Sequence, residues 1–199
     1  MRVIAGALKG RTLRVPANAT FRPTTDRVKE SVFNILNGFV HWPTCAVCDL
    51  YAGSGSLGIE ALSRGAASAV FVESHHASLA VIARNLGDLS LATRARVERR
   101  AVEQFLREQF LREQSLREQS LHEQAGRYGL VLADPPYRFD DIESLRDGIA
   151  GILEPDGIAV LEHERARNLD ATPALRVVDR REYGTTAVTF FQPTHGASS

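Results

Sequence analysis

The chain has 199 residues, 44% apolar and 24% charged, and its 24 basic and 24 acidic side chains give a formal net charge of zero. This length and composition suit one globular domain with a full core and a small appendage, and the zero net charge argues against a general polyanion binder. No apolar run is long enough to span a bilayer and no secretory signal is evident, so we expect a cytoplasmic protein.

Positive charge is concentrated at the start of the chain, where residues 1–30 contain seven basic side chains and two acidic ones. The basic residues are Arg2, Lys9, Arg11, Arg14, Arg22, Arg27 and Lys29. This excess predicts a surface that faces nucleic acid. The alternative is a basic hairpin that is only solvated.

The first thirty-nine residues predict a small hairpin and then a helix. Two short strands are expected around Gly6 and Gly10, and a helix capped by a Thr or by Asp26 should follow. Five apolar residues lie on one face of this helix, which should pack on the domain that follows. They are Val28, Val32, Ile35, Leu36 and Phe39.

Cys45 and Cys48 form a C-x-x-C pattern, which is found in redox pairs and in zinc sites. The chain has no second cysteine pair, and residues three apart on a strand point to opposite faces. We therefore predict that both are small buried side chains.

Residues 47–58 predict a strand, a tight turn and the start of a helix. The strand reaches Asp49, and the turn contains Gly53, Gly55 and Gly58. Glycine lets a ligand approach the backbone and permits backbone angles that other residues reach only at a cost. A small, nucleotide-like ligand is therefore expected on this turn.

The same residues fit the G-x-G-x-x-G pattern of dinucleotide sites, with Glu73 twenty residues after Gly53. However, Asp49 precedes the first glycine by four residues, which is the D-x-x-x-G-x-G pattern of S-adenosylmethionine (SAM) sites. Glu73 ends the next strand and could accept both ribose hydroxyls, or it could be a surface acid beside a turn. Asp49 could also hold the backbone N–H groups of the loop, and the two roles are compatible. The expected cofactor contacts are Asp49, Tyr51, Ala52, Gly53, Ser54, Gly55, Gly58 and Glu73.

Residues 101–125 contain a pentad repeat, with Leu-Arg-Glu-Gln-Phe at 106 and close copies at 111, 116 and 121. A period of five advances about 140° per repeat on a helix, so the leucines spiral and form no coiled-coil seam. We expect a helix lengthened by repeat expansion that protrudes into solvent or is partly disordered. The alternative is an arm that binds a partner.

Asp134, Pro135, Pro136 and Tyr137 follow another apolar strand and have no role in hydride transfer. A carboxylate and a backbone carbonyl can accept both N–H groups of a nucleobase amine, direct its lone pair to an electrophile and stabilise the charge that develops on nitrogen. The prolines fix the backbone so that the Pro135 carbonyl faces the substrate, and Tyr137 offers a stacking surface. The base must be unpaired or flipped out. We predict that these four residues are catalytic.

Strands are expected at 69–73, 96–99, 130–133 and 158–161 with helices between them, and a closing strand pair at 176–179 and 186–191. This alternation predicts a parallel sheet with helices on both faces and ligands at the carboxyl ends of its strands. Asp49, Glu73 and Asp134 all fall at such ends. The six histidines show no metal-ligand spacing, so no metal is predicted, although His163 could face the site.

Several blocks of sequence together match one known family. They are residues 2–6, 9–11, 22–24, 26–30, 33–34, 49–58, 134–137 and 183–185. In them the chain resembles the bacterial small-subunit (16S) ribosomal RNA guanine-N2 methyltransferases of the RsmD type. One departure is Arg99-Arg100-Ala101, where many relatives carry an acidic or amide residue that contacts adenine.

The resemblance implies an α/β, Rossmann-like SAM-dependent methyltransferase fold. It has a mostly parallel seven-stranded sheet with an antiparallel last strand, plus a small N-terminal β-hairpin and helix. It implies that the N-terminal hairpin helps to grip RNA, so we expect an RNA-facing extension at 1–40 and a methyltransferase domain at 41–193. The lengthened helix at 101–125 is a second departure, because the pentad repeats have no counterpart in the family, and a disordered tail is expected at 194–199 from its place at the chain end. The substrate would be the assembled or partly assembled small subunit, and the protein a monomer. The expected RNA contacts are Lys9, Arg11, Arg14, Arg22, Thr24, Arg27 and Arg138.

Two other functions remain open at this point. An adenine-N6 DNA methyltransferase would use the same chemistry, but the chain lacks an evident target-recognition domain. A ribosome-assembly factor with a vestigial SAM site would bind RNA without catalysis, but Asp49, Glu73 and Asp134 are all in place.

Overall fold

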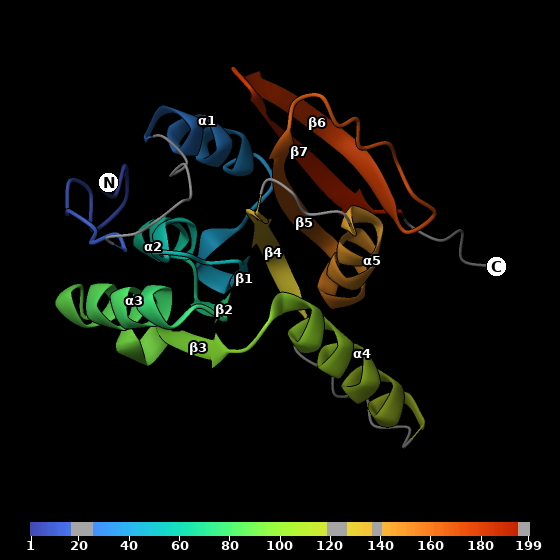
Figure 1. The fold of residues 1–199 in the computed structure, drawn as a ribbon, viewed down its shortest axis with the longest axis horizontal. Coiled ribbons are helices and arrows are strands. Elements are labelled where there is room, and N and C mark those ends of the chain that lie inside the picture. Colours follow the sequence, from blue (N-terminus) through green and yellow to red (C-terminus); the bar gives the residue numbers. More distant parts are fainter. Residues whose placement is uncertain (17–25, 119–126, 137–140, 195–199) are drawn as a thin grey trace.

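A seven-stranded sheet with the order β3-β2-β1-β4-β5-β7-β6 forms the centre of the computed structural model, in which residues 1–16, 26–118, 127–136 and 141–194 are described (Figure 1). The strands are β1 (Ala46–Leu50), β2 (Ser68–Glu73), β3 (Ala95–Arg99), β4 (Tyr128–Ala133), β5 (Leu153–Glu164), β6 (Leu175–Tyr183) and β7 (Thr186–Pro193). Neighbours from β3 to β5 are parallel, and β7 is antiparallel to both β5 and β6. The predicted fold class is confirmed.

The order of the strands reverses between β1 and β4. From β1 the chain builds outward through β2 and β3, and then returns to place β4 on the other side of β1. In open α/β sheets such a switch point leaves a crevice outside the carboxyl ends of the two strands. Asp49 lies near the end of β1 and Asp134 directly follows β4, so the topology brings the two sequence motifs to this crevice.

Helices cover both faces of the sheet (Figure 1). The helices are α1 (Asp26–Leu36), α2 (Ser56–Ser63), α3 (His76–Asp88), α4 (Val102–Glu118) and α5 (Ile142–Ile152), with short 3-10 turns at Trp42–Thr44 and Ala92–Arg94. Alternate residues of β1 separate the two cores, because Val47 packs with the side chains of α1, α2 and α3 whereas Cys48 packs with those of α4 and α5. No helix in the described part of the chain is long and apolar enough to cross a membrane.

The N-terminal segment, residues 1–16, folds back on itself with less strand structure than predicted. One antiparallel bridge joins Arg2 to Thr12, and the Val3 N–H donates to the Arg11 carbonyl at 2.9 Å. Gly6 has a φ of +81°, and a Cβ there would lie 1.9 Å from the Ser63 carbonyl oxygen. Glycine is therefore required for the segment to lie against α2.

The buried face of α1 differs from the prediction in three residues. Phe39 lies beyond the end of the helix and is 43% exposed, so its assignment to the buried face is wrong. Phe33 is fully buried and stacks on Trp42, with 6.0 Å between the ring centroids. Lys29 shares this buried face.

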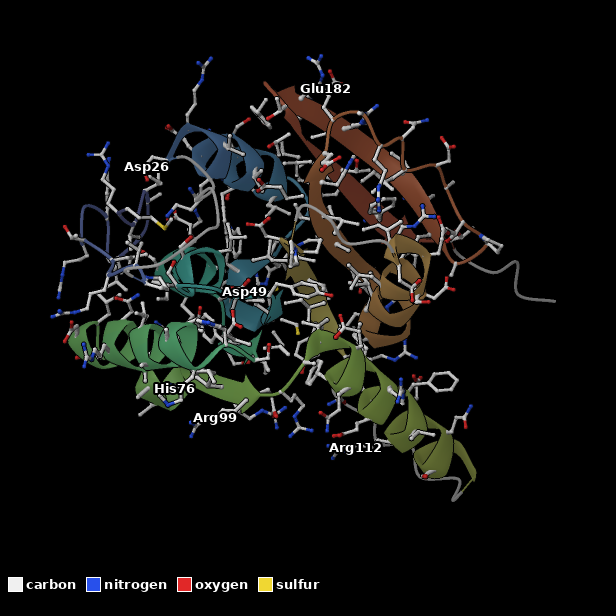
Figure 2. The ribbon with its side chains drawn as sticks, viewed as in Figure 1. Asp26, Asp49, His76, Arg99, Arg112 and Glu182 are labelled. Carbon is white, nitrogen blue, oxygen red and sulfur yellow. The ribbon has the colours of Figure 1, made fainter. Side chains whose placement is uncertain are left out.

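Only the first turns of α4 reach the core within the described residues. Val102, Phe105 and Leu106 are buried, whereas Phe110 and Leu111 are 55% and 54% exposed. Figure 2 shows Arg112 on the part of α4 that extends away from the sheet. After Leu106, none of the side chains from Arg107 to Ser115 is buried, in agreement with the expected protruding helix, and residues 119–126 lie outside the described residues.

Candidate active site

Asp49 is buried at the carboxyl end of β1 and connects this strand to α2. Its Oδ2 accepts the Gly58 backbone N–H at 2.9 Å. The predicted role of holding backbone N–H groups of the loop is therefore observed for one such group. Burial raises the pKa of Asp49 to about 8, because the Gly58 bond opposes the rise only in part and the nearby Glu73 charge adds to it. In Figure 2, Asp49 lies in the interior of the molecule.

Gly58 is required by packing. A Cβ at this position would lie 2.4 Å from the Phe71 ring and 3.1 Å from the Asp49 carboxylate. Glycine is favoured at position 53 for a different reason, its backbone conformation, because its φ is +57°. Space is not the constraint there, since the nearest atom to a Cβ would be 3.9 Å away. The backbone is therefore open at Gly53, as expected where a ligand approaches a loop.

Glu73 is 8% exposed, which excludes the alternative of a surface acid. Its Oε1 accepts the N–H groups of Ser74 and His75 at 2.8 and 2.7 Å, and its Oε2 accepts the Gly53 N–H at 2.9 Å. A carboxylate offers about four acceptor positions. Two ribose hydroxyls could therefore bind together only if the Gly53 N–H shares or releases its position.

The other loop residues point in several directions. The Tyr51 hydroxyl donates to Glu103 of α4 at 2.8 Å, and its side chain lines a hollow of about 420 Å³ between α4 and α5. Ala52 packs in the core, and its carbonyl accepts the Gly55 N–H at 2.7 Å. The Ser54 carbonyl accepts a side-chain N–H from Asn85 of α3 at 2.9 Å. The loop is thus held by both neighbouring helix layers.

Asp134, Pro135 and Pro136 line a small cavity of about 20 Å³ at the carboxyl ends of β4 and β5. His163, which the sequence suggested could face the site, lines the same cavity. Both of its ring nitrogens are engaged, Nδ1 2.9 Å from the Glu164 carbonyl and Nε2 2.8 Å from the Thr189 hydroxyl. Burial lowers the pKa of His163, which favours a neutral ring. The predicted Tyr137 and Arg138 lie outside the described residues.

The basic N-terminal residues divide into exposed and buried side chains. Lys9, Arg11, Arg14 and Arg27 are exposed, whereas Arg22 and Thr24 lie outside the described residues. Arg14 forms an ion pair with Asp88 at 3.0 Å, and Arg11 donates to the Asp88 carbonyl at 3.0 Å. Lys29 is fully buried, so its inclusion in a positive surface is wrong.

Cys45 and Cys48 are free and buried, which confirms the prediction of small buried side chains. Burial raises the pKa of the Cys45 thiol to about 12 and that of Cys48 well above its ordinary value. Neither thiol is therefore disposed to form the reactive thiolate. Among the residues that the structure describes, no group of three His, Cys, Asp or Glu side chains could hold a metal ion.

Comparison with known families settles the relationship of this chain. Residues 1–192 match the family described as "Conserved hypothetical protein 95". The chain belongs to this family. A Bacillus subtilis (strain 168) relative, YlbH, is 38% identical over 195 aligned positions, and the match covers 96% of this chain and 98% of YlbH. The Escherichia coli (strain K12) "Ribosomal RNA small subunit methyltransferase D" is 34% identical over 178 residues, 87% of this chain and 80% of the relative.

A solved structure of a similar protein has the same architecture as this chain. The Escherichia coli protein yhhF superposes with a TM-score of 0.78 at 29% identity, and the match covers 98% of this chain and 99% of that one. The resemblance to the RsmD-type methyltransferases stated from the sequence is thus confirmed.

Sequence reasoning missed three buried polar residues of this family member: Lys29, Glu60 and Asn85. Lys29 and Asn85 each lie on a mostly apolar helix face, whereas Glu60 lies in α2, which is buried over almost its whole length. Asn85, for example, is three residues after Ile82 and one before Leu86, both of which are buried. A polar residue at an apolar position of a helical pattern is the signal that could have found them.

Proposed function

We propose that this protein transfers a methyl group from SAM to the exocyclic N2 amine of a guanine in small-subunit ribosomal RNA. The observation that carries the proposal is that one switch point of the sheet receives both the glycine loop, after β1, and Asp134-Pro135-Pro136, after β4. A cofactor site and an amine-orienting motif at one crevice are what such a transfer requires. The name of the Escherichia coli relative supports methylation of small-subunit ribosomal RNA.

The donor set of the glycine loop fits SAM. Asp49 and Glu73 are buried carboxyl groups at one edge of the sheet, and their charges oppose each other, since Glu73 contributes to the raised pKa of Asp49. A cationic ligand group beside Asp49 would relieve this repulsion and hold the carboxylate ionised. Glu73 would accept ribose hydroxyls, and the open backbone at Gly53 would allow close approach. When bound, SAM supplies an electrophilic methyl group.

Asp134 and the Pro135 carbonyl would accept the two N–H groups of the guanine amine. Pro135 is buried and Pro136 is exposed, so the motif joins the core to the surface of the crevice. The acceptors turn the nitrogen lone pair out of conjugation with the ring and stabilise the positive charge that develops on nitrogen. Alignment of the amine with the methyl group can lower the activation barrier by roughly 7–11 kcal/mol, the value that corresponds to the effective molarities of well-oriented reactions. Tyr137 is proposed as the stacking surface for the flipped base.

The N-terminal segment is proposed as the RNA grip, with residues 1–40 facing RNA and residues 41–193 performing catalysis. Lys9, Arg11, Arg14 and Arg27 are exposed and could contact phosphates. Arg22, Thr24 and Arg138 complete the proposed set. Since the proposed substrate is the small subunit or its precursor, we place the protein in the cytoplasm. We also propose that it acts as a monomer.

Transfer of labelled methyl from SAM tests the proposal. Small subunits lacking the modification, purified ribosomal RNA and DNA are assayed in parallel, and the labelled nucleoside is identified. N2-methylguanosine from subunits is the expected result. N6-methyladenine in DNA would replace the proposal with a DNA methyltransferase, and SAM binding without transfer to any substrate would favour an assembly factor.

A further inference from the structure

Asn85 of α3 is 2% exposed, and its side-chain amide bonds to the backbone of two distant segments. Its Oδ1 accepts the Arg14 N–H at 2.9 Å, while its Nδ2 donates to the Arg14 carbonyl at 3.1 Å. The same Nδ2 donates to the Ser54 carbonyl at 2.9 Å. One planar amide therefore fixes the distance between residues 14 and 54.

These two segments are the ones that the proposed function assigns to RNA and to the cofactor. Arg14 belongs to the basic N-terminal segment, and Ser54 belongs to the glycine loop. Ser54 directly follows Gly53, whose N–H occupies an acceptor position of Glu73. A shift of the Ser54 carbonyl would therefore change the Gly53–Glu73 contact that ribose hydroxyls have to share.

The rest of the N-terminal segment is attached to α2, the helix that begins after the glycine loop. Glu60 accepts the N–H groups of Ile4 and Ala5 at 2.7 and 3.0 Å, and the Ser63 hydroxyl donates to the Ala5 carbonyl at 2.6 Å. The segment thus contacts both α2, which follows the loop, and α3, which follows β2. Movement of the segment under bound RNA would be transmitted to the loop where Asn85 contacts both.

We propose that Asn85 is a positioning residue that couples the glycine loop to the RNA-facing segment, so that cofactor and RNA each raise the affinity of the protein for the other. The inference rests on the proposed function. Coupling of two ligands is reciprocal, so it can be measured from either side. The cofactor side is simpler, because S-adenosylhomocysteine occupies the site without reacting.

The test compares binding of labelled S-adenosylhomocysteine with and without saturating small subunits that lack the modification. Asn85→Asp keeps the shape and the acceptor for the Arg14 N–H, but it places a carboxylate oxygen against the Ser54 and Arg14 carbonyls. We expect wild type to bind at least about fivefold more tightly with subunits present, and the ratio to fall near one in Asn85→Asp. Leu86→Ala is the control, because Leu86 is the buried neighbour on the same helix and makes none of these bonds; it should lose stability and keep the ratio.

Each other outcome overturns the inference. An unchanged ratio in Asn85→Asp, or an equal loss in Leu86→Ala, would show that Asn85 only stabilises the fold. A wild-type ratio of one, with methyl transfer intact, would overturn the coupling alone. No binding of S-adenosylhomocysteine by wild type would overturn the proposed function as well. If Asn85→Asp does not fold, Asn85→Ser replaces it, since its side chain is too short to span the three backbone groups.

Discussion

Lys29 and Glu60 face each other in the core, with Nζ 3.7 Å from the carboxylate and both side chains fully buried. The Lys29 ammonium also donates to the Arg2 carbonyl at 2.6 Å, and Glu60 accepts from Arg64 Nε at 2.9 Å. Desolvation lowers the pKa of Lys29, and the Glu60 charge opposes this effect. The pair therefore joins α1, α2 and the N-terminal segment through compensated charges.

Glu60→Gln should lower the free energy of unfolding by about 3 kcal/mol, because it leaves the Lys29 charge buried without its partner. Urea denaturation measures the change. Glu182→Gln is the matched control, since Glu182 forms exposed ion pairs with Arg165 and Arg180. Loss of the Glu182 charge should lower the free energy of unfolding by less than about 1 kcal/mol. Equal effects of the two substitutions would contradict the stabilising role of the buried pair.

Lys29 also shows where sequence reasoning succeeds and where it fails. Charge counting assigned it to the surface, although its spacing to Phe33 and Leu36 places it on the apolar face of α1. By contrast, β1, β2, β4 and the glycine loop were predictable, because alternation of apolar residues and the need for glycine are local properties. The rules of α/β topology alone were enough to predict that the strand ends carrying Asp49 and Asp134 lie at the same edge of the sheet.

Contacts between distant segments could not be predicted in this way. The three backbone donors around Glu73 depend on how the loop after β1 meets the end of β2, and the bonds of Asn85 depend on where residues 11–16 cross α3. Phe39 follows the helical period, yet α1 ends at Leu36, before the period reaches it. Such details are set by tertiary packing, which overrides local pattern.

Asp49 should give stability a pH dependence that Asp49→Asn removes. Burial raises the pKa of Asp49 from 3.8 to about 8, so between these values the folded state holds a proton that the unfolded chain has lost. The free energy of unfolding should therefore fall with rising pH in this window, by up to about 1.4 kcal/mol per pH unit. The measurement is urea denaturation of both proteins, without added cofactor, between about pH 5 and about pH 8.

The same carboxyl group predicts how cofactor binding responds to pH. A cationic ligand group favours ionised Asp49, so affinity for S-adenosylhomocysteine should rise several-fold as the pH approaches 8 and then level off. Asn at this position cannot ionise. The Asp49→Asn variant should therefore bind S-adenosylhomocysteine more weakly, with an affinity that does not change with pH over the same range. If wild type and Asp49→Asn showed the same pH dependence, both in the free energy of unfolding and in binding, Asp49 would not be the group that gains the proton in the folded state.

Asp134→Ala should separate catalysis from binding. Removal of the carboxylate leaves the guanine amine with one acceptor, so methyl transfer should fall at least about tenfold, which corresponds to about 1.4 kcal/mol. Binding to small subunits should change little, since phosphate contacts dominate affinity. Arg14→Ala should have the opposite effect, with weaker binding to small subunits and a smaller salt dependence of that binding, because the exposed Arg14 guanidinium is proposed to contact RNA. Near-normal turnover by Asp134→Ala would refute the catalytic assignment.

Deletion of residues 111–125 should leave methyl transfer and assembly state unchanged. Between Arg107 and Ser115 no side chain of α4 is buried, and the ion pair of Glu113 with Arg127 is a contact near the surface that the deletion would remove. Leu106→Ala is the contrasting variant, because Leu106 is buried against Gly148 of α5, where a Cβ would lie 2.8 Å from it, and its truncation should cost about 2–5 kcal/mol. Light scattering, binding to small subunits and the methyl-transfer assay check the deletion. A change in mass or a loss of subunit binding would mean that the deleted residues contact a partner, and the repeat would then be a binding arm.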